Sequence, residues 1–140
     1  MKLIDQITTM DRQVLLSTLW IFAILNYLYC DILGLMDAPL LQGFLQGNVD
    51  GMVIDEGFLL AAGVLMEIPI AMVLLSRVLD VPANRWANII AGMIMTLVQI
   101  ATLFVGTTTM YYSFFSAFEI TATVLIVLLA WTWPRTPGRS

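Results

Sequence analysis

The chain has 140 residues, of which 60% are apolar and 11% are charged, whereas soluble globular domains are about half apolar and about a quarter charged. This composition excludes an ordinary soluble globule. A bilayer span needs about 20 mainly apolar residues. Four spans with short connections therefore use up the length and leave no room for a separate catalytic domain.

The residue types that are missing exclude further function classes. Histidine is absent, which removes the usual haem ligand, the commonest zinc ligand and the usual general base at neutral pH. Cys30 is the single cysteine, so an intrachain disulfide cannot form. The net charge is −4 and the six basic residues are dispersed, so nucleic acid is not an expected partner. We expect no cofactor, and the type of any bound metal stays open.

Taken in chain order, the pattern predicts an all-α, polytopic membrane protein with one domain, residues 1–140. Residues 1–13 repeat apolar side chains at helical spacing and predict a short helix lying on the membrane, which either starts the bundle or contacts a partner or lipid. Apolar segments of 22, 23, 20 and 23 residues then predict spans at about 14–35, 57–79, 86–105 and 111–133. The expected fold is a four-transmembrane-helix bundle.

The connection at 36–56 is the longest expected loop. Asp37 can cap a helical turn that begins near Pro39. The loop is predicted either to lie across the mouth of the bundle as a lid or merely to cap the domain. Its acids Asp50, Asp55 and Glu56 could collect cations, or Asp55 and Glu56 could simply favour the N-terminal end of the second span.

The positive charges predict the orientation of the bundle. With four spans, all six basic residues fall on one side of the membrane: Lys2, Arg12, Arg77, Arg85, Arg135 and Arg139. The other two connections carry none. By the positive-inside rule that side is cytoplasmic, so both termini are predicted inside the cell.

Polar side chains at similar depths predict one binding site inside the bundle. At about 1.5 Å per residue, one polar group from each span falls about 10–15 Å below the outer boundary, and Asp31 with Tyr27 lies nearer the outer mouth. The candidate ligand- or proton-binding residues are Glu67, Glu119, Asn26, Gln99, Asp31 and Tyr27. A small or polar stripe along the third span is predicted to face inward: Arg85, Asn88, Gly92, Thr96, Gln99, Thr102 and Gly106.

The two membrane glutamates carry most of the functional argument. An ionisable acid in mid-membrane is a functional candidate by default. Pro69 lacks the amide hydrogen that would bond to the carbonyl of Leu65, so a kink is predicted beside Glu67. The freed carbonyl, with Glu67 and Glu119, could hold a cation, and the two acids could exchange protons as a coupled pair. For Asn26, Asn88 and Gln99 the favoured role is to hold helices together.

Three stretches carry a resemblance to a family: LSTLWIFAILNYLYCDILGLMD at 16–37, EIPIAMVLLSRVL at 67–79 and RWANIIAG at 85–92. The chain resembles small four-span bacterial membrane proteins of a family of unknown function. This resemblance covers most of the chain and implies a multi-pass location in the bacterial inner membrane, but it supplies no site residues. Small multidrug transporters are similar in size and also use a membrane glutamate, although theirs lies in the first helix, where this chain has Asn26.

Two functions remain open after these steps. In the first, the protein binds and transports a cation or small solute at the polar site, coupled to protons. In the second, it is a non-catalytic membrane subunit or a lipid-binding bundle. An intramembrane enzyme is the weakest alternative, because no nucleophile or metal motif accompanies the acids. The expected partners are membrane lipid, the solute or cation and a second copy of the chain. The small-residue line Ser113, Ala117 and Thr121 could contact that copy or could equally serve packing within the chain, so the copy number stays open.

Overall fold

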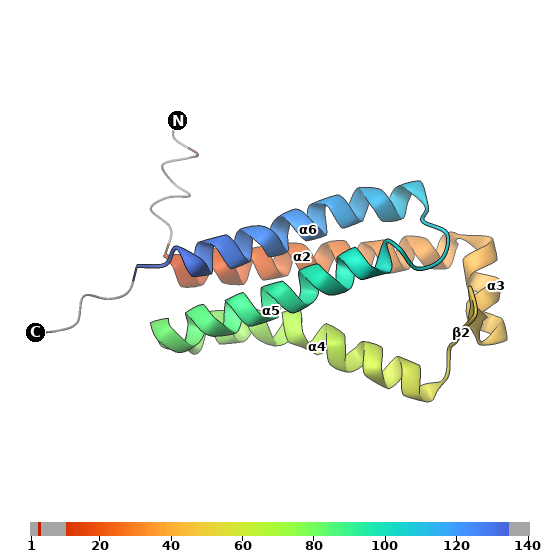
Figure 1. Cartoon of the computed structure of the whole chain (residues 1–140), viewed down its shortest axis with the longest axis horizontal. Helices are drawn as coiled ribbons and strands as arrows, with labels where there is room; N and C mark the ends of the chain where they lie inside the picture. The colour runs from red at the N-terminus through yellow and green to blue at the C-terminus, as the bar shows by residue number, and fades with distance from the viewer. Residues whose placement is uncertain (1–2, 4–10, 135–140) are drawn as a thin grey trace, which may run out of the picture.

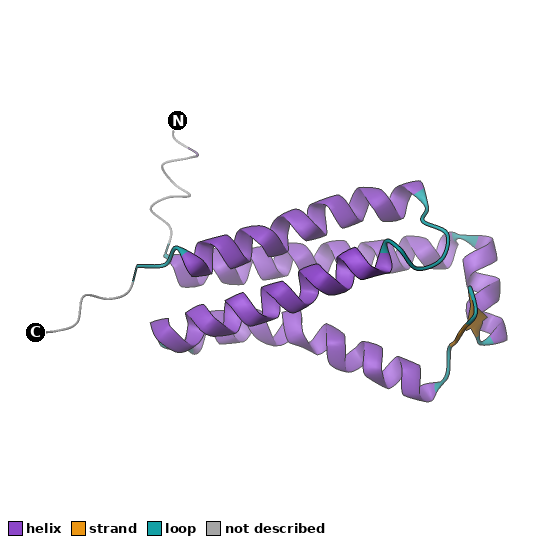
Figure 2. Ribbon diagram, viewed as in Figure 1, coloured by secondary structure: helices purple, strands orange, loops and turns teal. Residues whose placement is uncertain are grey.

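The computed structural model describes residue 3 and residues 11–134. In this part of the chain four long helices are joined by one short helix and a small hairpin (Figures 1 and 2). The elements are α2 (Arg12–Met36), α3 (Ala38–Gln46), β1 (Asn48–Val49), β2 (Met52–Val53), α4 (Glu56–Val78), α5 (Val81–Thr102) and α6 (Met110–Trp131). Most of the interfacial helix predicted at 1–13 lies outside the described residues.

Three of these helices, α2, α4 and α6, are long and apolar enough to cross a membrane. They correspond to the first, second and fourth predicted spans. The third, α5, has 22 residues, a length of about 33 Å at 1.5 Å per residue. Its mean hydropathy is lowered by polar residues that are buried, among them Asn84, Asn88 and Gln99.

Helix starts are fixed by short polar side chains or by proline. Asp11 accepts a hydrogen bond from the amide of Gln13 at 3.1 Å, and Asp55 accepts one from Phe58 at 2.8 Å. The helices α3 and α5 instead have proline in their first turn, where the missing amide hydrogen costs nothing. As a result α2 begins two residues before the predicted span and α5 begins five residues before it.

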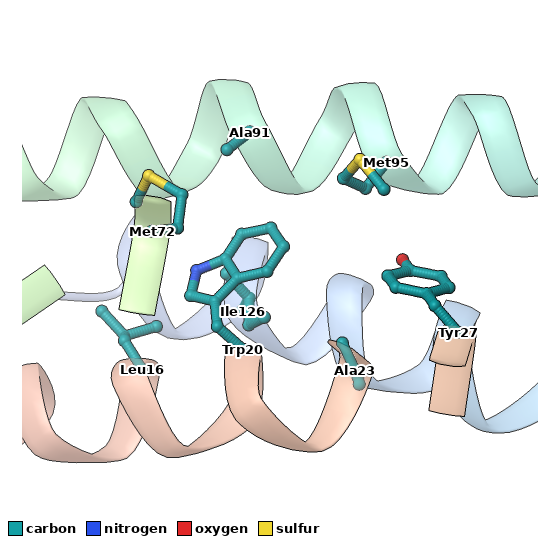
Figure 3. Packing of buried hydrophobic residues seen from close by; sticks show 9 residues of the cluster. Leu16, Trp20, Ala23, Tyr27, Met72, Ala91, Met95 and Ile126 are labelled. Carbon is teal, nitrogen blue, oxygen red and sulfur yellow. The ribbon is translucent and has the colours of Figure 1, made fainter. Parts of the chain in front are cut away.

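The core lies along one face of α2. Leu16, Trp20 and Ala23 are fully buried there, and they pack with Met72 of α4 and Ile126 of α6 in one hydrophobic cluster (Figure 3). The same cluster includes Ala91 and Met95 of α5. One line of α2 side chains therefore ties the other three long helices together.

Hydrogen bonds bring the start of α2, the end of α4, the start of α5 and the end of α6 to one end of the bundle. Arg12 donates to the carbonyl of Leu129 at 2.8 Å, Gln13 donates to that of Leu79 at 3.0 Å, and Arg85 donates to that of Ala130 at 3.1 Å. Arg77 lies in the last turn of α4, at this same end. The helices thus alternate in direction, and the arginines among the described residues lie at one end of the bundle.

The connection at 36–56 contains more regular secondary structure than the single helical turn predicted near Pro39. It forms α3, which Figure 1 shows turning across the far end of the bundle, and then a two-stranded antiparallel hairpin. The hairpin turns at Asp50 and Gly51, which have φ angles of 49° and 85°, as a tight two-residue turn requires. The Asp50 carboxylate packs against Gly106 of the α5–α6 loop. The connection is therefore anchored to the helix ends by contacts of its own.

Close packing of α5 on α6 depends on Gly92. A Cβ atom placed there would lie 2.6 Å from a methyl carbon of Val127 and 3.3 Å from the carbonyl oxygen of Thr123. We expect Gly92→Ala to lower the free energy of unfolding by about 1–3 kcal/mol, because overpacking forces the helices apart. Unfolding by sodium dodecyl sulfate in mixed micelles measures it. Gly63→Ala is the control, since a Cβ there would meet nothing within 4 Å; an equal loss in both variants would contradict the packing argument.

Candidate functional site

A cavity of about 160 Å³ lies between α2, α4, α5 and α6, in the half of the bundle away from the arginines. Polar or aromatic side chains line one part of it: Tyr27, Asp31, Gln99, Thr102, Tyr112 and Glu119. Cys30 and four apolar side chains, Leu65, Met66, Met95 and Val98, complete the lining. The lining therefore holds two acids and no basic residue.

Two polar atoms of this cavity lack a partner. In the described part of the chain, the buried side-chain atoms without a hydrogen bond are the hydroxyl oxygen of Tyr27 and Oε1 of Glu119. Glu119 is 1% exposed and Tyr27 is 6% exposed. Figure 3 shows the Tyr27 ring reaching from α2 toward Met95 on α5. An unsatisfied buried carboxylate oxygen is costly, so these two atoms mark the place where a ligand or water would be stabilised.

Three other polar side chains of the cavity wall, Gln99, Thr102 and Tyr112, make hydrogen bonds to each other or to nearby helix positions. Gln99 donates through Nε2 to Ser116 at 2.7 Å. The Tyr112 hydroxyl donates to Thr102 at 2.7 Å, and Thr102 in turn donates to the carbonyl oxygen of Gln99 at 2.8 Å. These bonds join α5 to α6 around Glu119. These hydrogen bonds hold the wall in place, whereas Oε1 of Glu119 has no partner.

Asp31 occupies the rim of the site. It lines the cavity but its side chain is exposed, and it lies one turn beyond Tyr27 on α2, toward the end that carries α3. No residue of the 36–56 connection lines the cavity. The structure therefore gives no contact by which that connection would act as a lid over this site.

Two of the six candidate residues lie elsewhere. Glu67 is exposed on α4 and does not line the cavity. Asn26 is half-buried, and its amide donates to the carbonyl of Phe22, one turn earlier in the same helix, at 2.8 Å. The six polar residues that depth alone predicts to form one site therefore fall into two groups. Tyr27, Asp31, Gln99 and Glu119 meet at one cavity, whereas Glu67 and Asn26 face away from it.

Pro69 does shape the cavity, although not by presenting Glu67. It is fully buried inside α4, and Figure 1 shows α4 bent near its middle, with its first half diverging from α5. Because proline has no amide hydrogen, the carbonyl of Leu65 loses its helical partner. Leu65 and Met66 are the residues of α4 that line the cavity. The bend therefore separates α4 from α5 where the site lies.

A second polar cluster, near the arginine end, has its hydrogen bonds made internally. Trp20 donates to Oδ1 of Asn88 at 2.8 Å, and Ser76 donates to the same atom at 3.3 Å. Asn88 donates to Asn84 Oδ1 at 2.7 Å, and Asn84 donates to the carbonyl of Ser76 at 2.7 Å. This cluster links α2, α4 and α5. Sequence reasoning assigned Asn88 to helix pairing but missed Trp20, Ser76 and Asn84, although Asn84 lies one turn before Asn88 on the same helix side.

Comparison with known proteins supplies a family and nothing about chemistry. No curated protein and no solved structure matched the chain. A family model described as a family of unknown function (DUF6326) matches residues 1–138. Since this match covers almost the whole sequence, the chain belongs to the family of unknown function DUF6326.

Proposed function

We propose that the protein crosses the bacterial inner membrane four times, with α5 as the third span and both termini in the cytoplasm. The length of α5 supports this, as does its apolar outer surface, where Ile90, Met93 and Leu97 are exposed. The arginine end then faces the cytoplasm by the positive-inside rule. The cavity lies in the outer half of the membrane.

Within this bundle, we propose that the cavity binds and carries a small organic cation. The observation that carries the proposal is Glu119, whose Oε1 is buried and unpartnered beside a cavity that holds two acids and no base. A cation supplies the missing partner, and the tyrosine rings of the lining add cation–π attraction. The carbon atoms of such a solute would contact the four apolar side chains of the lining, which are Leu65, Met66, Met95 and Val98.

The size of the cavity limits the solute. An apolar cavity of about 150 Å³ in another protein binds benzene, so 160 Å³ accommodates about six non-hydrogen atoms. An inorganic metal ion is less well served, because the described residues contain no group of three or more His, Cys, Asp or Glu side chains that could hold one. Methylammonium and tetramethylammonium meet both the charge and the size requirement.

Proton coupling follows from the same acid. With no basic residue in the lining, a Glu119 without its solute is neutralised most simply by a proton. Entry of a cation then displaces that proton. Asp31 at the rim attracts the incoming cation before it reaches the buried acid. The cycle exchanges one cation for one proton.

The experiment uses the full chain in vesicles of phosphatidylethanolamine and phosphatidylglycerol. We expect uptake of radiolabelled tetramethylammonium that depends on the protein and releases protons to a pH-sensitive dye. Tetrabutylammonium is the size control and is expected to be neither bound nor carried. If neither methylammonium nor tetramethylammonium binds to the reconstituted protein, the proposal fails. The pair Glu119→Gln and Glu67→Gln supplies the matched variants.

One observation favours the second function, that of a non-catalytic membrane subunit. Glu67 points out of the bundle from an apolar span, and an acid in that position calls for a partner outside the single chain. In this case a pull-down from native membranes yields another protein in fixed ratio, and the isolated chain carries no cation. Uptake by the purified chain alone would oppose this function.

A further inference from the structure

Tyr27 carries the second unpartnered atom of the cavity, and packing fixes its position. Its side chain belongs to the line of α2 residues that forms the core, after Leu16, Trp20 and Ala23. The ring is buried, so it cannot turn its hydroxyl toward solvent without leaving that core. The hydroxyl oxygen is therefore held inside the bundle, although none of the described residues bonds to it.

A second contact between the same two helices explains why this hydroxyl has no partner. Both α2 and α5 begin at the arginine end and run in the same direction. Trp20 on α2 donates to Asn88, which lies 68 positions later on α5, at 2.8 Å. Seven residues further along both helices, the same offset pairs Tyr27 with Met95, and Figure 3 shows the Tyr27 ring reaching toward that side chain. A thioether sulfur is a weak acceptor, so the polar end of Tyr27 stays available to a solute in the cavity.

Two oxygen atoms on two helices then await hydrogen bonds: Oε1 of Glu119 on α6 and the hydroxyl oxygen of Tyr27 on α2. Both residues line the same cavity. A quaternary ammonium ion has no N–H group, so it offers its charge to the carboxylate and leaves both oxygens without a hydrogen bond. A primary ammonium group has three N–H donors, and its hydrogen bonds are strengthened by its charge. A primary ammonium therefore satisfies what the cavity leaves open.

The other attractions in the cavity do not separate these two classes of cation. Coulomb attraction to Glu119 acts on any ion of one positive charge. The faces of aromatic rings attract both ammonium and quaternary ammonium ions. A primary ammonium is also the more strongly hydrated of the two, so without hydrogen-bond acceptors in the cavity it would bind the more weakly. The preference between the classes thus depends on the unpartnered oxygens.

We infer that the cavity selects primary ammonium ions over quaternary ones, and that Tyr27 sets this preference by accepting one N–H of the solute while Glu119 accepts another. This inference rests on the proposed function, because it names the class of cation that the same cavity takes. Glu119 supplies charge for both classes. The Tyr27 hydroxyl contributes only to a solute that carries N–H groups.

The test compares tert-butylammonium with tetramethylammonium. Each ion has one positive charge and a tetrahedral arrangement of five non-hydrogen atoms, so the two differ in N–H donors and hardly in size. We expect tert-butylammonium to bind the parent about tenfold more tightly, because only this ion forms the charged hydrogen bonds. Tyr27→Phe is expected to weaken tert-butylammonium about tenfold and to change tetramethylammonium by less than about twofold. Isothermal titration of each ion into the full-length protein in detergent measures the four affinities.

Tyr29→Phe is the matched control. It makes the same chemical change on the same helix, at a side chain that is 57% exposed and does not line the cavity. We expect it to keep the preference of the parent. Helix content by circular dichroism checks that both variants fold, and the preference of the parent needs no variant.

Two results would overturn the inference and leave the proposed function standing. In the first, tetramethylammonium binds the parent as tightly as tert-butylammonium does. In the second, Tyr27→Phe weakens both ions equally, which would mean that the hydroxyl only supports the shape of the cavity. If no ammonium ion binds, methylammonium included, the proposed function fails and the preference fails with it.

Discussion

Glu119→Gln is expected to lower the affinity for methylammonium and tetramethylammonium about a hundredfold. Glu119 is 1% exposed, so a cation beside it is shielded from water and the attraction between them is strong. Removing one member of such a buried charge pair costs about 2–5 kcal/mol or more, and about 2.8 kcal/mol corresponds to a hundredfold. Glutamine has nearly the same shape, so the cavity itself should persist.

The measurement is equilibrium binding of the radiolabelled cation to purified protein in detergent, followed by uptake into vesicles. Glu67→Gln is the matched control, because it makes the same chemical change on a side chain that lies outside the cavity. We expect it to keep the affinity of the parent. Loss of binding in Glu67→Gln with retention in Glu119→Gln would reverse the assignment and restore the site predicted around Glu67.

The sequence predicts the long helices well because apolar length and flanking charge act locally. The first, second and fourth predicted spans coincide with helices apolar enough to cross a membrane, and α5 covers most of the third predicted span. The hairpin was not predicted, although Asp50–Gly51 is a typical two-residue turn signal. Its strands have only two residues each, too few for an alternating pattern to be visible.

The site was predicted less completely, because depth along a helix says nothing about direction around it. Glu67 and Glu119 share a depth, yet only Glu119 faces the cavity. The spacing of Glu67 from the buried residues of α4 shows that its side chain points away from the cavity. Pro69, Met72 and Ser76 follow each other at intervals of three and four and therefore share a side, whereas Glu67 is two residues before Pro69 and lies opposite. The three-dimensional packing of α2 against α4 decides which of these sides is buried.

Asn88→Leu is expected to lower the free energy of unfolding by about 3 kcal/mol, the largest effect on stability that we predict. Its side chain accepts hydrogen bonds from Trp20 and Ser76 and donates to Asn84. Trp20, Ser76 and Asn84 are all fully buried. Leucine would leave the indole N–H of Trp20 and Oδ1 of Asn84 without a partner, and each unsatisfied buried group costs about 1–3 kcal/mol.

Unfolding in mixed micelles measures this loss, and Asn26→Leu is the matched control. Among the described residues, the Asn26 amide donates to the carbonyl of Phe22 in its own helix and to no other element, so its replacement should change the unfolding free energy by less than about 0.5 kcal/mol. If both variants lose the same free energy of unfolding, the hydrogen bonds of the Asn88 cluster contribute no stability beyond the helix propensity of the replaced residue. A large loss confined to Asn88→Leu would mean that hydrogen bonds hold α2, α4 and α5 together at the arginine end. In the part of the chain that the structure describes, the buried side-chain atoms without a hydrogen-bond partner are then those of Glu119 and Tyr27 at the cavity.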